Sequence, residues 1–301
     1  MKLGRKDYTI SVKTGTDANK AKFKKECVQG EIYHATDTGF FYIAEVTAGA
    51  SDATLSKFGA PVFQNQYSVS LDGTDDYIDL GSNAFINNSS AFSISTWFKL
   101  DSWATTYPGI CVIKTAGAQG FIIGLSNTSP YSGVWVGSNG TDGFRGFSTS
   151  NGALAATITS GWHHLVLTYD GVDSQASSSR TLYIDGTEYG ITNHVPLGNS
   201  SNNNYIGRAA NRTIDGMVDE FAIFNSALTA AQITNIYKGE DSGGSGGTNG
   251  VPGSLATFNP VGWWRMGDND GGTGTTITDQ GSGGNDGTLT NGPTFSTTVP
   301  T

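Results

Sequence analysis

The chain of 301 residues has a formal net charge of −9, and only 14% of its residues are charged, against about 25% in an average soluble domain. Glycine accounts for 42 residues, about twice its usual share of roughly 7%. The acidic balance disfavours nucleic acid as a partner. Cys27 and Cys111 are too few for a disulfide framework. No run approaches the roughly 20 apolar residues of a membrane span, so no membrane insertion is expected.

Residues 1–60 predict a small β-α-β-β unit. The stretch "DYTISVK" (7–13) alternates like a strand, and "DANKAKFKKECVQG" (17–30) has the cap and the terminal glycine of a short helix. "EIYHA" (31–35) and "FFYIAEV" (40–46) predict two strands around the turn "TDTG". A unit of this size is marginal alone, so we expect it to dock or to oligomerise.

Residues 61–240 alternate short strand-like runs with turn signals, which predicts a β-sandwich. In "FSISTWFKL", every second residue from Phe92 to Leu100 points to one face. The other strand-like runs are "YSVSLDG", "DYIDLG", "GICVIKT", "GFIIGLS", "GVWVGS", "WHHLVLTYDG", "TLYIDGTEYG", "YIGRA" and "GMVDEFAIFN". One helix is predicted in "LTAAQITNIYKG", where Thr229 and Gln232 have the spacing of a capping box.

The last part of the chain divides into a linker and a tail. Residues 241–254, "DSGGSGGTNGVPGS", have the composition of a flexible linker. The tail, residues 255–301, contains Trp263 and Trp264 but is too small to bury two indoles by itself. We therefore expect the tail to pack on another part of the protein.

The runs "SVSLDGTDDYIDLG", "FSISTWFKL", "WHHLVLTYDG", "LYIDGTEYG" and "GMVDEFAIFNSALTAAQITNIY" resemble, in order and spacing, the laminin-G-like branch of the concanavalin A-like lectin/glucanase jelly rolls. In that family a tryptophan strand and a "T-x-x-D-x-S-G-x-G-N-D-G-T-L" stretch come first. Here "WWRMGDND" and "TITDQGSGGNDGTLTNGPTF" stand last. The resemblance implies a mainly β, circularly permuted jelly roll. Its tail completes its own sandwich, or else completes a neighbour's or begins a second copy.

Residues 1–60 carry "KTGT" followed by "QGEIYHATDTGFFYI", and this pattern resembles a short domain that begins many bacteriophage tail-fibre and virion appendage proteins. The matching positions are Gly15–Thr16, Gly30–Glu31–Ile32 and Thr36–Asp37–Thr38, whereas "IAEVTAG" stands where the family has "I-G-D-G". The resemblance implies a virion-anchoring or oligomerising domain, a homotrimer, other virion proteins as partners, and a location on the particle surface.

Four aspartates are candidate metal ligands. The jelly-roll resemblance implies a structural Ca²⁺ between the first turn and the last strand, and the matching positions are Asp72, Asp75, Asp76 and Asp219. Ca²⁺ takes six to eight oxygen ligands, many of them carboxylates. The alternative is that these aspartates only shape and cap turns.

Aromatic and amide side chains in turn-rich stretches are candidate glycan ligands, because sugars stack on exposed rings and hydrogen-bond to a few polar groups. The alternative for each ring is a place in the core or in a subunit interface. The candidates are Trp103, Tyr107, Tyr131, Trp135, Phe144, Arg145, Asn203 and Tyr205.

The sequence predicts no catalytic site. Glucanases with this jelly roll use an E-x-D-x-E strand, and no two glutamates here have that spacing. Asp219 and Glu220 are neighbours on a strand and should point to opposite faces, as should His163 and His164, which therefore cannot chelate a metal together.

The motifs together predict a bacteriophage virion protein, of appendage, head-fibre or decoration type, that displays a lectin-like domain. Two functions stay open at this point. The domain binds host-surface or environmental glycans, or it is a purely structural decoration or cement protein without glycan binding. A polysaccharide depolymerase is a third reading, and the missing carboxylate pair argues against it.

Overall fold

The computed structural model describes residues 63–83, 85–87, 91–103, 105–116, 119–128, 133–138, 158, 160–171, 180–189, 198–199, 203–209 and 211–301, together with four strands before residue 63. The chain divides into two compact units, Met1–Gln64 and Asn65–Thr301. Among the described residues, no helix has the length and apolar character needed to cross a membrane.

The N-terminal unit contains a four-stranded sheet. Its strands follow the order β1 (Val12–Gly15), β2 (Ile32–Ala35), β3 (Phe41–Glu45) and β4 (Thr54–Phe58). The β1–β2 pair is parallel, and the other two pairs are antiparallel. Three of these strands overlap the predicted runs, and β4 was not predicted. The predicted helix, residues 17–30, lies outside the described residues.

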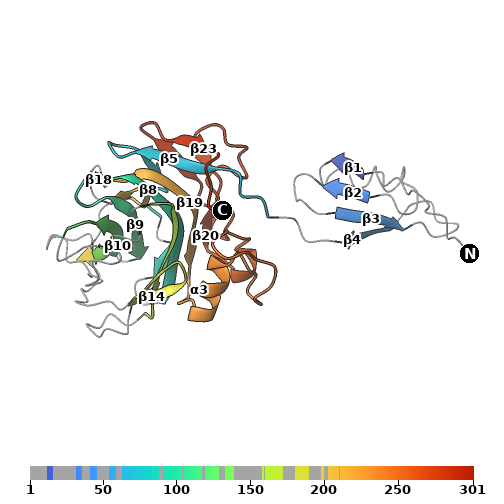
Figure 1. Ribbon diagram of the computed structural model, residues 1–301, viewed down its shortest axis with the longest axis horizontal. Helices are drawn as coiled ribbons and strands as arrows, with labels where there is room; N and C mark the ends of the chain where they lie inside the picture. Colours follow the sequence, from blue (N-terminus) through green and yellow to red (C-terminus); the bar gives the residue numbers. More distant parts are fainter. Residues whose placement is uncertain are drawn as a thin grey trace, which may run out of the picture. The chain divides into compact units, whose positions relative to one another are not determined.

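The larger unit is a sandwich of two sheets that pack face to face (Figure 1). The eight-stranded sheet has the order β14 (Thr187–Tyr189), β13 (Arg180–Ile184), β12 (Trp162–Tyr169), β8 (Phe92–Ser102), β19 (Asp215–Phe224), β5 (Ser68–Asp72) and β23 (Thr294–Ser296), with β20 (Gly262–Trp264) paired to β19. The nine-stranded sheet has the order β11 (Gly133–Ser138), β10 (Gln119–Ser126), β9 (Gly109–Ala116), β16 (Tyr205–Ile206), β6 (Tyr77–Asp79), β22 (Gly287–Thr290) and β21 (Thr276–Ile277), with β15 (Gly198–Asn199) paired to β10 and β7 (Ile86–Asn87) to β9.

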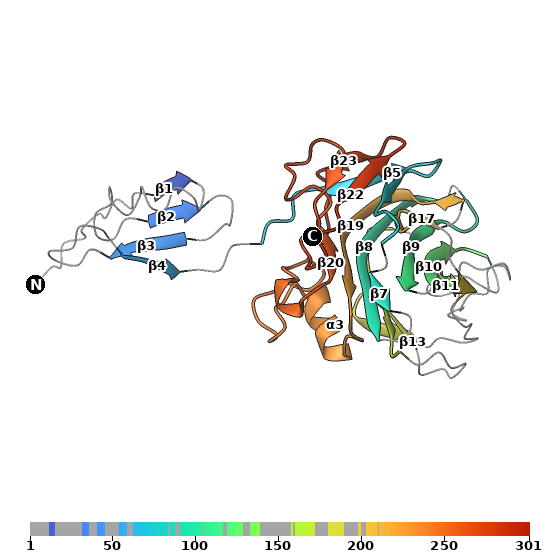
Figure 2. The ribbon, with the colours of Figure 1, turned by 180° about the vertical axis from the view of Figure 1, so that it is seen from behind.

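The core lies between the two sheets, as the alternation in β8 predicts. Phe92, Ile94 and Phe98 are 0% exposed in the main apolar cluster. The intervening residues of β8 face α3 (Ala230–Tyr237), which lies on the outer side of this sheet (Figures 1 and 2). Trp97 of β8 stacks on Tyr237 of α3 with 5.9 Å between ring centroids. The predicted capping box of α3, Thr229 with Gln232, is confirmed.

The C-terminal segment, residues 255–301, supplies strands to both sheets of its own chain. β20 pairs with β19 and β23 with β5, whereas β22 pairs with β6. Trp264 is 0% exposed in the main core and meets Phe85 edge to face at 5.4 Å. This segment thereby buries its own tryptophans against the body. The circular permutation is a relation to other proteins, and it stays a prediction.

The glycine-rich stretch 241–254 forms hydrogen-bonded turns against α3 rather than an open coil. Asp241 accepts hydrogen bonds from the backbone of Gly243 and Ser245 at 2.8 and 3.1 Å, and Gly250 N–H donates to Tyr237 O at 3.1 Å. A Cβ on Gly247 would lie 1.9 Å from Lys238 O, so close packing of backbone against backbone requires glycine here. The composition that suggests a flexible linker is thus also the one that compact turns need.

Candidate functional site

The outer face of the nine-stranded sheet presents partly buried polar and aromatic side chains. Ile78, Cys111 and Ile206 are 0% exposed and point into the core. Because side chains alternate along a strand, the neighbours of these residues point outward. The register places outward-facing Tyr205 of β16 beside Asp79 of β6 on one side and beside Val112 of β9 on the other.

Two arginines lie over tyrosine rings at this face. The guanidinium carbon of Arg208 lies 4.8 Å from the ring centroid of Tyr77 and 5.3 Å from that of Tyr205, and the two rings meet edge to face at 5.0 Å. Arg212 lies 4.6 Å from the ring of Tyr107. We call these five residues the tyrosine–arginine face. Cation–π contacts of this kind hold a guanidinium group in place over the ring. The N–H donors of the group lie in its own plane and point outward from its edge.

A short hairpin, β17 (Arg208–Ala209) with β18 (Arg212–Thr213), delivers both arginines. It leaves the sheet at Gly207, whose φ of 81° favours glycine. A Cβ at this position would lie 2.4 Å from a Leu71 methyl group. The sequence "YIGRAANRT" therefore turns at its glycine and lays the hairpin over the outward-facing rings.

Polar groups border the tyrosine–arginine face. The Nδ2 group of Asn203 lies 3.4 Å from both carboxylate oxygens of Asp79. On the far side of β6, the register sets Thr288 of β22 opposite Asp79 and Thr290 opposite Tyr77. The C-terminal segment therefore adds hydroxyl groups to this face. Burial and the nearby Asp79 carboxylate raise the pKa of Tyr205, so its phenol stays protonated at neutral pH.

The predicted glycan ligands divide into three groups. Tyr107, Asn203 and Tyr205 lie at or beside the tyrosine–arginine face. Trp103 is only partly buried and packs against the main core. The prediction for Trp135 is wrong, because the residue is 3% exposed, packs on Val112 and Ile122, and donates its indole N–H to Leu125 O at 2.9 Å. Tyr131, Phe144 and Arg145 lie outside the described residues.

Sequence reasoning missed Tyr77, Arg208 and Arg212. The signal for Tyr77 was present, since alternation along "DYIDL" puts Tyr77 and Asp79 on the face opposite Ile78. The arginines could not be assigned in this way. Their positions depend on the hairpin folding over the sheet, and no local pattern indicates it.

Three of the four predicted metal ligands lie together in the turn between β5 and β6. The carboxylates of Asp72, Asp75 and Asp76 each offer an oxygen within 4.8 Å of the others. Asp76 is 5% exposed, and burial together with its two like-charged neighbours raises the pKa of its carboxyl. Asp76 also accepts a hydrogen bond from Asp72 N–H at 3.1 Å, so the cluster shapes the turn as well. We call these three residues the aspartate turn.

The structure does not bring Asp219 to the aspartate turn. Asp215, four residues earlier in β19, is the residue paired with Asp72, so about 13 Å of strand separates Asp219 from that pairing. One ion cannot take ligands from both places, and the predicted four-residue set is corrected to three. Asp219 instead accepts hydrogen bonds from Asn65 Nδ2 at 3.0 Å and from Glu220 N–H at 2.8 Å.

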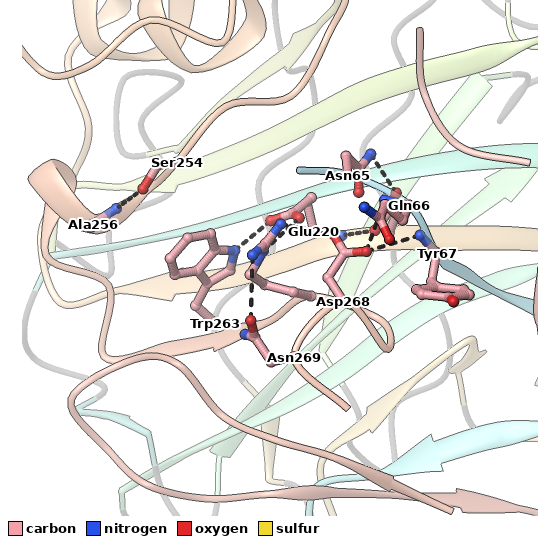
Figure 3. A network of polar contacts seen from close by, with 11 residues as sticks. Asn65, Gln66, Tyr67, Glu220, Ser254, Ala256, Trp263, Asp268 and Asn269 are labelled. Atoms are coloured by element: carbon pink, nitrogen blue, oxygen red, sulfur yellow. Dashed lines mark hydrogen bonds and ion pairs between the residues drawn. The ribbon is translucent and has the colours of Figure 1, made fainter. Parts of the chain in front are cut away.

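Asp219 and Glu220 belong to a buried polar network that ties the C-terminal segment to β19, and Figure 3 labels Glu220 and Trp263 within it. The residues are 0% and 2% exposed. Glu220 accepts from the indole N–H of Trp263 at 2.6 Å and pairs with Arg265 Nε at 3.1 Å. These two adjacent acids are committed to protein partners and closed to substrate, so they do not form a glycosidase pair.

His163 and His164 point to opposite sides of β12, as predicted. His163 lies 2.8 Å from Asp185 Oδ2. His164 bonds to Ser95 Oγ at 2.8 Å and packs beside both Trp97 and Tyr237, with ring centroids at 4.9 and 6.2 Å. Burial lowers the pKa of His164 to about 4. Both residues therefore fill structural positions.

The two face-to-face sheets define a lectin-like jelly roll. A family model described as the concanavalin A-like lectin/glucanases superfamily matches residues 72–234, which is more than half of the chain. The chain therefore belongs to the concanavalin A-like lectin/glucanases superfamily. No curated protein shows significant sequence similarity to it.

Several solved structures are similar in fold. A candidate carbohydrate-binding protein from Bacteroides ovatus covers 91% of this chain and 72% of its own length, with a TM-score of 0.52 and 18% identity. Domain 4 of the arabinanase AbnA from Geobacillus stearothermophilus, solved with arabinotriose, aligns with 64% of this chain over 80% of its own length, with a TM-score of 0.37 and 19% identity. The CBM40 module of a Ruminococcus gnavus sialidase aligns with 57% of this chain over 96% of its own length, with a TM-score of 0.41 and 14% identity.

Proposed function

We propose that the jelly roll binds carbohydrate through the tyrosine–arginine face. The observation that carries this proposal is the pair of guanidinium groups held on partly buried tyrosine rings on an outer sheet face. Sugar rings offer apolar C–H surfaces that pack on aromatic rings and hydroxyl groups that bond to a few fixed polar groups. The description of the Bacteroides ovatus protein as carbohydrate-binding agrees with this proposal.

Each residue of the face has a distinct task in the proposed binding. Tyr77 and Tyr205 supply ring surface, and Arg208 donates in-plane N–H groups to sugar oxygens. Asp79 accepts hydrogen bonds from sugar hydroxyls, as carboxylates do. Thr288 of β22 stands beside Asp79 and can both donate and accept.

The aspartate turn is the proposed calcium site. Its three carboxylates supply hard oxygens at a spacing compatible with one ion, which suits Ca²⁺ and its ligand distances of roughly 2.3–2.6 Å. Asp72, Asp75 and Asp76 would hold the ion, and its charge would offset the repulsion among them. The ion would then fix the β5–β6 turn. We expect added Ca²⁺ to raise the melting temperature, and Asp76→Asn to abolish that rise while the melting temperature of Arg212→Gln still responds.

We further propose that the protein is displayed on a bacteriophage virion, as a homotrimer anchored through residues 1–60 to other virion proteins. The motifs quoted for residues 1–60 support this placement. The bound carbohydrate would then be a host-surface or environmental glycan. Analytical ultracentrifugation of the full chain tests the trimer, and mass spectrometry or immunolabelling of purified particles tests the location.

The test of carbohydrate binding is a panel of bacterial surface polysaccharides probed with the full-length protein, with Ca²⁺ and with chelator. We expect at least one polysaccharide to bind and Tyr205→Val to weaken that binding. Tyr189→Val, a tyrosine change on β14 of the other sheet, serves as the matched control. A folded protein that binds no polysaccharide would contradict the proposal and favour a purely structural decoration role.

A further inference from the structure

Asp219, Glu220 and Asp268 form a group of three carboxyls where the C-terminal segment packs on β19. A β-bulge in β19 brings Asp219 and Glu220 together. The register between β19 and β8 shifts between Asp219 and Ala222, so β19 carries one extra residue there. Glu220 occupies the extra position with a φ of 45°, a backbone conformation that is unusual outside glycine. The bulge breaks the strict alternation of faces and lets Asp219 and Glu220 share one polar network. Asp268 of the C-terminal segment is the third carboxyl, and we call the three the carboxyl cluster.

The carboxyl cluster joins three segments that are distant in the sequence (Figure 3). Asn65 donates to Asp219 at 3.0 Å. Asp268 accepts from the backbone N–H groups of Gln66 and Tyr67 at 2.8 and 2.9 Å. The start of the sandwich, the bulge of β19 and the C-terminal segment therefore meet at this cluster.

One guanidinium group contacts two of these three carboxylates. Arg265 contacts Glu220 through Nε at 3.1 Å and Asp268 through a terminal nitrogen at 2.7 Å. The side chains of Glu220 and Asp268 are each 2% exposed, and Arg265 is 13% exposed. Among the described residues, Arg265 is the only cation whose charge acts on the cluster, and it acts on Glu220 and Asp268. Trp263, Asn65 and backbone N–H groups supply the remaining contacts. Three ionised acids would leave two uncompensated negative charges in a buried place, which is costly.

Protonation is the inexpensive way to relieve that charge. Burial, followed by the neighbouring Glu220 carboxylate, raises the pKa of Asp219 well above its ordinary value. Burial also raises the pKa of Glu220 to about 7, even though Arg265 and the Trp263 N–H oppose the shift. Burial raises the pKa of Asp268 as well.

We propose that the carboxyl cluster is a proton-dependent latch, which holds the C-terminal segment on the sandwich when it is protonated and holds it less firmly when it ionises. The sign follows from linkage. An acid that keeps its proton longer in the folded state binds more protons than the unfolded chain, so its contribution to stability declines as pH rises. For Glu220 that decline runs from its unfolded value near pH 4.5 to about pH 7.

The test compares the wild type with Glu220→Gln between pH 5 and pH 8. Glutamine is close in shape and can still accept from Trp263, but it cannot ionise. We expect the melting temperature of the variant, relative to that of the wild type, to rise with pH. The difference between the two melting temperatures should increase by about 5 °C from pH 5 to pH 8. Glu188→Gln on exposed β14 is the matched control and should show no such trend.

Comparing the two melting curves at each pH removes the contribution of other titrating groups, including histidines. A difference between Glu220→Gln and wild type that is constant with pH would overturn the latch. If the variant does not fold, carbon-13 NMR of wild-type glutamate carboxyls decides. One glutamate must then titrate near pH 7, and ordinary titration of every glutamate near pH 4.5 would overturn the proposal.

Hydrogen exchange locates the effect. At pH 8, after correction for intrinsic exchange rates, the amides of β20 and β23 should open more often than at pH 5.5, relative to the amides of β12. Equal changes in the C-terminal strands and in β12 would indicate a loss of global stability and would contradict a latch on this segment.

Discussion

The two outer faces of the sandwich both carry aromatic rings, but the described residues bury these rings to different extents. On the eight-stranded sheet, α3 lies over Trp97 and His164 and stacks Tyr237 against both. On the nine-stranded sheet, the comparable positions hold Tyr77 and Tyr205, which stay partly exposed under Arg208. An aromatic ring on a strand therefore does not indicate a binding function until it is known whether another segment packs over it. The tyrosine–arginine face, whose rings stay partly exposed, is the candidate for recognition, and the rings packed under α3 are structural.

The largest expected effect comes from removing the C-terminal segment. A chain that ends at Glu240 loses β20 to β23 and exposes both sheets at the positions they occupied. Loss of two buried tryptophans at about 3–5 kcal/mol each approaches the whole stability of a domain, about 5–15 kcal/mol. We expect insoluble or unfolded protein by far-UV circular dichroism. A shortened chain with unchanged stability would show that this segment is not part of the fold.

A single indole tests the same packing more finely. Trp264 is 0% exposed, contacts Phe85 and Phe221, and donates to Asn285 O at 2.9 Å. We expect Trp264→Ala to lower the free energy of unfolding by about 3–5 kcal/mol in urea denaturation. Trp103→Ala, at a partly exposed position, should cost clearly less. Equal losses would contradict the placement of Trp264 in the core.

The rings packed under α3 should also respond to acid. The pKa of His164 is lowered to about 4 from an ordinary value of 6.5, so the unfolded chain binds a proton more readily. The contribution of buried, neutral His164 to the free energy of unfolding is therefore fully present above pH 6.5, and it falls by up to about 3 kcal/mol as pH drops toward 4. We expect His164→Phe, which keeps a ring in the stack, to flatten this limb of the stability curve. An unchanged acid limb would mean that His164 is not held neutral by burial. This trend runs opposite to that of the carboxyl cluster, so the two contributions are separable.

The smallest effects on stability belong to the tyrosine–arginine face. Tyr205→Val and Arg208→Gln should each change the free energy of unfolding by less than about 1 kcal/mol, because cation–π contacts at exposed sites contribute about 0.5–1 kcal/mol. Their effect on carbohydrate affinity should be about tenfold, equivalent to about 1.4 kcal/mol. Isothermal titration calorimetry measures the affinity. A large loss of stability without a loss of affinity would reverse the assignment of the two faces.

The sequence predicted those features that local chemistry dictates. The period of two in "FSISTWFKL" predicts the core side of β8, and the Thr229–Gln232 spacing predicts the helix start. The need to bury Trp263 and Trp264 predicts that the C-terminal segment must pack on the body. Each of these follows from a few neighbouring residues and a general rule.

The rest depends on contacts between distant segments. Asp219 was placed with Asp72 because both belong to family motifs, but the register of β5 against β19 separates them. Asp219 and Glu220 were expected on opposite faces, and the bulge at Glu220 removes that alternation. Trp135 stands in a turn-rich stretch, yet Gly124 on the neighbouring strand leaves room for its indole to lie buried on the sheet. No local pattern carries this information.

The most direct test of the central claim compares how far a bound polysaccharide protects each outer face from oxidation, measured by hydroxyl-radical footprinting on the full-length protein. We predict that oxidation of Tyr77 and Tyr205 falls when the polysaccharide is added, while oxidation of Tyr237, the last residue of α3 on the other sheet, does not change. Unchanged oxidation of Tyr77 and Tyr205 in the presence of a bound polysaccharide would contradict the assignment and would move the binding site away from the nine-stranded sheet.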